Sequence, residues 1–128
     1  MKHYLWNLIA NIKNGAKAKK PFIYQRKTFY CVKFLDVLWD EGFILGYKNV
    51  SSQKLLIKIF LKYTNGKSSI KVIKSISKPG FRVNLTLKEI WKIKINSGIL
   101  IISTNKGILS NNFCKKKKLG GELLCYVK

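Results

Sequence analysis

The sequence predicts an α+β protein in which an N-terminal α-β-α-β-β module packs against a mainly β C-terminal module. Hydrophobic residues make up 47% of the 128 residues, which is enough to build a buried core. Apolar residues recur at helical spacing early in the chain, and strand-like runs dominate later. An Asn-Gly turn signal follows Tyr63, so we place the N-terminal module at residues 1–62 and the C-terminal module at residues 63–128.

Two helices are expected in the N-terminal module. The first has an apolar stripe at helical spacing, formed by Leu5, Leu8, Ile9 and Ile12. We expect it to end at Asn14-Gly15, because glycine commonly follows the last helical residue. Thr28 is expected to cap the second helix with its hydroxyl. The apolar face of that helix is expected to contain Tyr30, Phe34, Val37 and Leu38.

The rest of this module is predicted to be β-structure. Residues 22–25 form a short candidate strand, and residues 43–50 and 54–61 are expected to pair as a hairpin across residues 51–53. The side chains of the last strand alternate between two faces. One face is expected to hold Leu55, Ile57, Ile59 and Leu61.

The C-terminal module is expected to be mostly strand. Strands are predicted at residues 70–77, 81–85, 99–103 and 122–127. Residues 99–102 are wholly aliphatic, which suits a strand that is buried on both faces. Pro79-Gly80 is a turn signal, and a short helix is expected near residues 87–91.

The charge of the chain points to a polyanionic partner. Lysine and arginine total 26 against five acidic residues, and the formal net charge is +21. Self-repulsion of this size weakens a compact monomer, so the charge is expected to serve a partner over a large area. Nucleic acid is favoured over a membrane, because a spanning helix needs roughly 20 apolar residues and the longest aliphatic run is residues 99–102.

The sequence contains no recognisable catalytic or metal-binding pattern. The acidic residues are scattered, and the single histidine, His3, has no evident nucleophile or orienting acid. Cys31, Cys114 and Cys125 lack the close spacing of zinc ligands and are expected to be reduced thiols. We therefore expect no enzyme activity, metal, cofactor or small-molecule substrate.

The segment at residues 101–107 is the main candidate for nucleic-acid contact. A strand leads into three small polar residues, a lysine and a glycine, namely Ser103, Thr104, Asn105, Lys106 and Gly107. Small hydroxyl and amide groups can bond base edges and sugar hydroxyls, and glycine allows the backbone to approach a phosphate closely. The residue types leave open a second reading, in which an Asx or Ser/Thr turn caps a short helix.

Two further groups of cations are candidate phosphate contacts. Lys78 and Arg82 flank the Pro-Gly turn, which by itself is also typical of an ordinary hairpin. Lys116 and Lys117 belong to a run of four lysines that could equally be a solvated face. Close to a hydroxyl-rich loop, such a run becomes a plausible phosphate clamp.

Taken together, these segments resemble the bacterial type of small-subunit ribosomal protein eight over nearly the whole chain. The similarity rests on six motifs in the family's order: residues 8–15 with their closing Asn14-Gly15, Glu41-Gly42-Phe43-Ile44, Leu61-Lys62-Tyr63 with Gly66-Lys67, Ser77-Lys78-Pro79-Gly80-Phe81-Arg82, Ser103-Thr104-Asn105-Lys106-Gly107, and Leu119-Gly120-Gly121-Glu122 with Cys125-Tyr126. The resemblance implies a two-module α+β fold and a structural role in the small ribosomal subunit. The implied partners are the central domain of small-subunit ribosomal RNA and neighbouring ribosomal proteins, with a role early in assembly.

The resemblance also implies which residues contact RNA. In the family, the Ser-Thr-x-Lys-Gly loop and the Gly-Gly-Glu segment enter the RNA helix core. The matching positions here are Ser103, Thr104, Lys106, Gly107 and Glu122, and Asn105 keeps the polarity of the variable position. The Glu122 carboxylate is expected to accept from a base or hydroxyl, to orient the loop backbone, or simply to pair with a nearby lysine.

The chain departs from the family pattern at three positions. Asn84 stands where an aromatic residue is common, so this position offers no ring for stacking on RNA. Phe29 replaces a basic residue early in the second helix, and Lys118 stands where glycine usually precedes the Leu-Gly-Gly segment.

Two wider questions remain open from the sequence. A non-ribosomal basic RNA-binding module is the alternative function, and it should show aromatic side chains exposed on a sheet, for which the sequence contains no recognisable motif. Lys, Ile and Asn supply 24, 16 and 10 residues, a bias expected of an A/T-rich gene. We therefore expect an organellar ribosome, with the mitochondrion favoured over the plastid.

Overall fold

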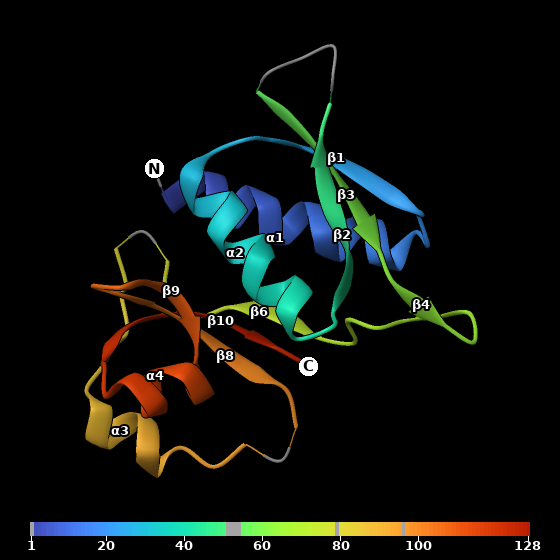
Figure 1. The fold of residues 1–128 in the computed structure, drawn as a ribbon. Coiled ribbons are helices and arrows are strands. Elements are labelled where there is room, and N and C mark those ends of the chain that lie inside the picture. Colours follow the sequence, from blue (N-terminus) through green and yellow to red (C-terminus); the bar gives the residue numbers. More distant parts are fainter. Residues whose placement is uncertain (1, 51–54, 79, 96) are drawn as a thin grey trace. The chain divides into compact units, whose positions relative to one another are not determined.

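The computed structural model describes the chain except at residues 1, 51–54, 79 and 96 (Figure 1). It divides into two compact units, Met1–Lys71 and Val72–Lys128. Each unit combines helices with antiparallel strands, so the predicted α+β class is confirmed. The first unit includes a short hairpin after residue 62, which the sequence-based division places in the second module.

The first unit contains two helices and a three-stranded antiparallel sheet of order β1-β3-β2 (Figure 1). Its elements are α1 (Lys2–Lys17), β1 (Phe22–Arg26), α2 (Phe29–Asp40), β2 (Ile44–Asn49) and β3 (Leu56–Leu61). This is the predicted α-β-α-β-β order. The predicted turn at residues 51–53 lies outside the described residues.

The predicted end of the first helix is wrong, because α1 continues through Asn14 and Gly15 to Lys17. Gly15 is required for packing instead. A Cβ atom there would lie 2.6 Å from the Ile23 Cγ2 atom and 3.2 Å from the Leu61 Cδ1 atom. The glycine therefore lets α1 approach the sheet more closely than any other residue would allow.

The predicted cap of the second helix is confirmed, since the Thr28 hydroxyl accepts a 3.2 Å hydrogen bond from the Cys31 backbone N–H. The buried face of α2 consists of Cys31, Phe34, Leu35 and Leu38. On β3 the alternation holds for Ile57, Ile59 and Leu61, all of which are buried. Leu55 is 62% exposed, because it precedes the paired part of the strand.

A two-residue hairpin closes the first unit. It joins β4 (Tyr63–Thr64) to β5 (Lys67–Ser68). Asn65 and Gly66 have φ values of 53° and 77°, and two successive positive φ values match the twist of the paired strands. The Asn-Gly signal in the sequence therefore does mark a tight turn.

The second unit is built on an antiparallel sheet of order β6-β10-β8-β9, with β7 also paired to β10. Its elements are β6 (Ile73–Ser75), β7 (Asn84–Leu85), α3 (Leu87–Lys92), β8 (Ile99–Thr104), β9 (Gly107–Ser110), α4 (Asn111–Lys117) and β10 (Gly121–Val127). Residues 99–102 are all buried and β8 lies inside the sheet, as predicted. The strands predicted at residues 70–77 and 81–85 are much shorter in the structure.

Both helices of this unit cover the same core. Ile90 of α3 and Cys114 of α4 are buried in one cluster with Leu100, Ile102 and Leu123. Thr86 and Glu89 form a capping box at the start of α3, where a short helix was expected. The sequence analysis missed α4, because only Phe113 and Cys114 interrupt its polar residues and no apolar period is visible.

Candidate nucleic-acid interface

The segment between β6 and β7 forms a tight turn at residues 78–81. The Lys78 N–H donates to the Phe81 carbonyl at 2.8 Å, and the Phe81 N–H donates back to the Lys78 carbonyl at 2.9 Å. Gly80 has a φ of 84°, which suits glycine, while Pro79 lies outside the described residues. Phe81 is 69% exposed, so the turn presents an aromatic ring between Lys78 and Arg82, which are both exposed.

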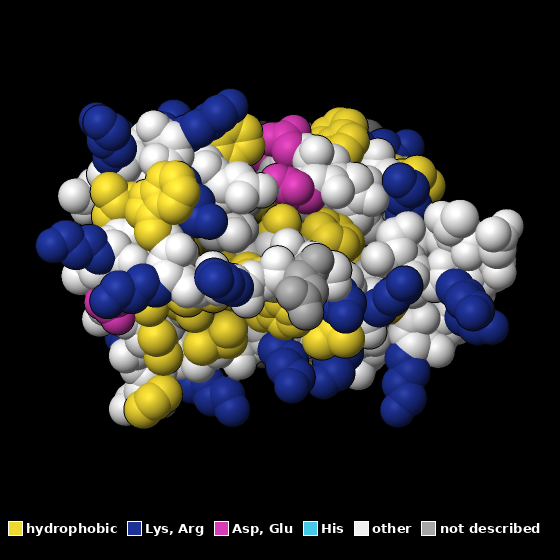
Figure 2. Space-filling model, turned by 90° about the horizontal axis from the view of Figure 1, so that it is seen from below, with side chains coloured by type: hydrophobic (Ala, Val, Ile, Leu, Met, Phe, Trp, Pro, Cys, Tyr) yellow, Lys and Arg dark blue, Asp and Glu magenta, His cyan; other side chains and the backbone are white. Residues whose placement is uncertain are grey.

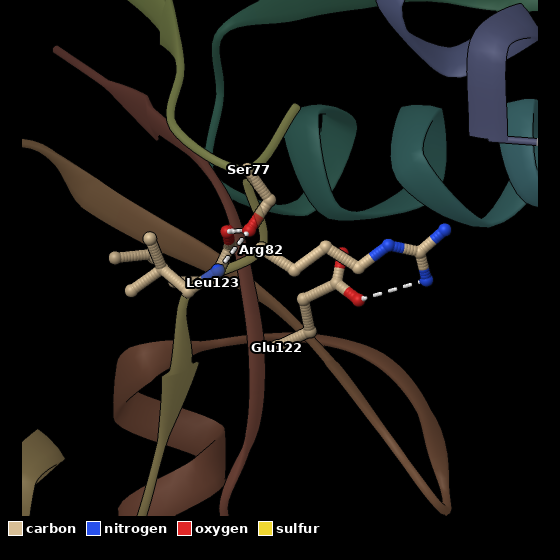
Figure 3. Close-up of polar contacts among 5 residues, drawn as sticks. Ser77, Arg82, Glu122 and Leu123 are labelled. Atoms are coloured by element: carbon tan, nitrogen blue, oxygen red, sulfur yellow. Dashed lines mark hydrogen bonds and ion pairs between the residues drawn. The ribbon is translucent and has the colours of Figure 1, made fainter. Parts of the chain in front are cut away.

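Ser77 fastens this turn to β10. Its buried hydroxyl donates to the Leu123 carbonyl at 2.5 Å and accepts from the Val83 N–H at 3.0 Å (Figure 3). One side chain thus holds both arms of the turn against the same strand. The sequence analysis did not select Ser77 as a site residue, although it opens the Ser-Lys-Pro-Gly motif.

The turn and β10 are also joined by an ion pair. The Arg82 Nη1 atom lies 3.8 Å from the Glu122 Oε1 atom, and the two side chains are 55% and 10% exposed (Figure 3). Of the roles open for Glu122, pairing is therefore observed, with an arginine of the turn rather than with a lysine. The pair therefore links the residue that follows the turn to the start of β10.

Ser103 and Glu122 are neighbours in the sheet. They are paired residues of β8 and β10, and Ser103 is paired on its other side with Ile108 of β9. The fold therefore brings together two predicted site residues that are far apart in the sequence. Ser103 is partly exposed at this end of the sheet.

The other residues of the 103–107 segment form the hairpin between β8 and β9. The Thr104 hydroxyl donates to the Gly107 carbonyl at 2.8 Å and accepts from the Lys106 N–H at 3.2 Å. A Ser/Thr turn is thus present, but it closes a hairpin and does not cap a helix. Asn105 and Lys106 are exposed at its tip, and Gly107 has a φ of 115°.

The Gly120-Gly121 pair lets β10 begin directly against two neighbouring segments. A Cβ atom at Gly121 would lie 2.1 Å from the Ser103 carbonyl oxygen, and one at Gly120 would lie 2.6 Å from the Leu85 carbonyl oxygen. Backbone atoms cannot move aside as side chains can. The glycines therefore set the spacing between Ser103 and the strand that carries Glu122.

Lys116 and Lys117 lie on the last turn of α4 and are exposed. The ammonium of Lys116 lies 6.0 Å from the centroid of the Phe113 ring. Lys118 ends the helix with a φ of 57°, and the Leu119 N–H donates back to the Cys114 carbonyl at 3.0 Å. The left-handed backbone at Lys118 is the conformation that glycine adopts most easily.

Basic side chains are far more numerous than acidic ones on the surface of the protein. Figure 2 shows lysine and arginine side chains spread across the visible face.

The described residues contain no group of three or more histidine, cysteine or acidic residues that could hold a metal. No helix in the described part of the chain is long and apolar enough to span a membrane.

The fold and this surface define a class, namely a small basic α+β protein with exposed polar hairpins set among cations. The comparisons identify the family within that class. Residues 4–128 match the family model of ribosomal protein S8, so the chain belongs to this family. Membership disfavours the alternative of a non-ribosomal binding module and agrees with a protein that is not an enzyme.

Several curated relatives cover nearly the whole chain. A small ribosomal subunit protein uS8 from Buchnera aphidicola is 38% identical over 121 residues, which is 94% of this chain and 93% of the relative. The protein of the same name from Wigglesworthia glossinidia brevipalpis is 36% identical over 95% of this chain and 94% of the relative. That from Pseudomonas fluorescens strain Pf0-1 is 35% identical over 99% of this chain and 98% of the relative.

Proposed function

We propose that the chain is a structural component of the small ribosomal subunit and binds the central domain of its RNA through the second unit. Family membership supports the ribosomal role, and the charge of +21 supports a polyanionic partner. Contacts with neighbouring ribosomal proteins are part of the same proposal. The role is that of a scaffold protein, without a reaction of its own.

The observation that carries the proposal is the convergence at one end of the second unit's sheet. Ser103 and Glu122 are paired there, and Arg82 reaches Glu122 from the 78–81 turn. A hydroxyl, a carboxylate and a guanidinium offer both donors and acceptors to bases and sugars. Directional groups of this kind can distinguish one RNA site from another.

The remaining predicted residues divide into two roles. Thr104 and Gly107 shape the hairpin, because the Thr104 hydroxyl donates a hydrogen bond to the Gly107 carbonyl. Exposed side chains supply contacts to the RNA: Asn105, Lys106, Lys78, Lys116 and Lys117. Lysine is a flexible point charge and suits phosphate, which every RNA presents.

The test compares Ser103→Ala with the double change Lys116→Ala and Lys117→Ala. Ser103→Ala removes one hydrogen bond that the complex would bury. It should weaken binding of cognate RNA by roughly 1–3 kcal/mol and leave binding of a scrambled RNA nearly unchanged. The lysine change should weaken both RNAs alike. If Ser103→Ala weakens both RNAs equally, Ser103 is not a specificity residue and this assignment is wrong.

Thr104 requires its own comparison, because Thr104→Ala removes a bond within the hairpin as well as a potential RNA contact. Thr104→Ser keeps the hydroxyl and is the matched control. If the threonine only shapes the turn, Thr104→Ser should bind cognate RNA as the original chain does. Thr104→Ala should then lower the melting temperature together with the affinity.

We also propose an organellar ribosome, in the mitochondrion rather than the plastid. The support is compositional, since lysine outnumbers arginine 24 to 2 as an A/T-rich gene would produce. The relatives described above are bacterial. Sequencing the genomic region around the gene tests this proposal, and neighbouring genes of a bacterial chromosome would overturn it.

A further inference from the structure

The sheet of the first unit has one face covered by helices and one face exposed. Ile23, Ile57 and Ile59 point toward the helices and are buried. The outward positions alternate with these, and none of them is buried. They are Phe22, Tyr24 and Arg26 on β1, Leu56, Lys58 and Phe60 on β3, and Lys48 on β2.

Aromatic rings and lysines are in direct contact on this face. The Lys58 ammonium lies 3.9 Å from the Phe22 ring centroid and 5.4 Å from that of Phe60. The Lys48 ammonium lies 5.7 Å from the Phe60 centroid. These cation–π contacts hold the two ammonium groups beside the rings and so position their charges on this face of the sheet.

The edge of the same face carries the most accessible ring. Tyr24 is 48% exposed and packs edge-on against Phe22, with ring centroids 5.6 Å apart. It is paired across the sheet with Lys58. Tyr24 therefore offers a flat aromatic surface next to a positioned cation.

The charge on this face has one sign. None of the three strands contains an acidic residue. A partner that matches the face must supply negative charge together with flat groups that stack on aromatic rings. Unpaired nucleotides supply both, because phosphates lie between successive bases and every base has a π-face.

We infer that this face of the first unit is a second RNA-binding surface, and that it takes single-stranded RNA. A base stacks on the exposed Tyr24 ring, while Lys58 and Lys48, which lie beside Phe22 and Phe60, neutralise phosphates. The surface is distinct from the polar hairpins of the second unit, which offer directional groups instead of stacking rings. An acidic protein segment would use the cations alone, and the experiment separates these two partners.

The experiment measures binding of the full chain to a labelled oligouridylate of about twelve nucleotides, within the usual range of stacking platforms. Tyr24→Thr removes the ring from an exposed strand position, and Tyr24→Phe is the matched variant that keeps it. Lys58→Gln removes the cation between the rings. Lys67→Gln is its control, because Lys67 is an exposed lysine of the separate β4–β5 hairpin.

Tyr24→Thr is expected to weaken binding of the oligouridylate about tenfold, as loss of one stacked base would. Lys58→Gln is expected to weaken it by about the same factor, because it removes a cation that neutralises phosphate beside the ring. Tyr24→Phe and Lys67→Gln should stay within about twofold of the original chain. Ultraviolet crosslinking of the oligouridylate should label the peptide that contains Tyr24. Thermal melts of each variant confirm that the fold is retained.

Three results would overturn the inference. The first is equal binding of the oligouridylate by Tyr24→Thr and Tyr24→Phe. The second is that Tyr24→Thr weakens binding to a duplex RNA of the same length as much as it weakens binding to the oligouridylate, since duplex bases cannot stack on the ring. The third is competition by an oligoglutamate that depends on Lys58 and not on Tyr24, which would favour an acidic protein partner. The Ser103 test uses cognate RNA and fails or succeeds independently.

Discussion

Arg82 and Glu122 form an ion pair in which the guanidinium is half exposed and the carboxylate is almost completely buried. Their closest atoms lie 3.8 Å apart, and the side chains are 55% and 10% exposed. The energetic cost of a pair of this kind falls mainly on the buried partner, since it has lost most of its water. The arginine side is open to solvent and to a ligand.

This asymmetry predicts different effects for the two partners. Arg82→Ala should lower the free energy of unfolding by about 1 kcal/mol, because it removes the cation that offsets a buried charge while solvent screens the exposed side. Adding Glu122→Gln to Arg82→Ala should restore part of that loss. Urea unfolding of the single and double variants measures both values.

Lys78→Ala is the control, because Lys78 is a cation of the same turn that forms no ion pair among the described residues. Its unfolding free energy should change by less than about 0.5 kcal/mol. Equal losses for Lys78→Ala and Arg82→Ala would show that general charge, and not the pair, stabilises the turn.

A second prediction concerns the close contact of β10 with β8. Gly121→Ala should lower the unfolding free energy by about 3 kcal/mol, because the new Cβ would lie 2.1 Å from the Ser103 carbonyl oxygen. Gly66→Ala is the matched control. It meets no atom within 4 Å, and its φ of 77° should cost only about 1 kcal/mol. Similar losses for both variants would argue against the steric explanation.

A third prediction concerns the end of α4. Lys118→Gly should raise the unfolding free energy by about 0.5 kcal/mol, because Lys118 adopts a φ of 57° that glycine tolerates without strain. Lys117→Gly removes the same charge one residue earlier, inside the helix, and should lower it by about 1 kcal/mol. Opposite signs in paired thermal melts would support the account, and a loss for both would contradict it.

The elements predicted from sequence are those with a strong local signal. The aliphatic run at residues 99–102 correctly predicted a buried strand, and Thr28 correctly predicted a helix start. Gly15 misled the prediction, because its role depends on Ile23 and Leu61, which a local pattern cannot reveal. The helix α4 was missed for a similar reason, since its only buried residues are Asn111 and Cys114, and two such residues give no apolar period.

The candidate site was only partly visible in the sequence. Its residue types could be selected from motifs, but the pairing of Ser103 with Glu122 arises from strand register over a long sequence separation. The sequence also could not show whether the Thr104 hydroxyl contacts RNA or bonds within its own hairpin, as it does in the structure. The aromatic face of the first unit was missed because Phe22 and Phe60 become neighbours only when β1 pairs with β3.

A fourth prediction follows from the buried thiols. Burial raises the pKa of Cys125 from 9.0 to about 12. In the unfolded chain this thiol loses its proton above pH 9.0, while the folded chain keeps it, so the contribution of Cys125 to stability should fall as pH rises from 9.0 toward 12. The direction is that of an acid whose folded pKa is raised.

The measurement compares the original chain with Cys125→Ala, which has no thiol to titrate at this position. The difference in their unfolding free energies should shrink by about 1 kcal/mol between about pH 8 and about pH 10. Lysines and tyrosines titrate in the same range but are common to both chains, so they cancel. A difference that stays constant with pH would contradict the predicted shift.

The last prediction separates general from specific binding through the effect of salt. Each neutralised phosphate releases counterions, so log affinity falls linearly with log salt concentration. If about six phosphates are contacted, the slope should be about −4 to −5. Lys116→Ala with Lys117→Ala should flatten it by about one to two units, if those exposed ammonium groups contact phosphate as proposed. Ser103→Ala should lower affinity for cognate RNA without changing the slope, since a neutral hydroxyl displaces no counterion. A slope that flattens equally in both variants would mean that Ser103 acts by placing cations, and a flat profile in the original chain would rule out phosphate neutralisation as the source of its affinity.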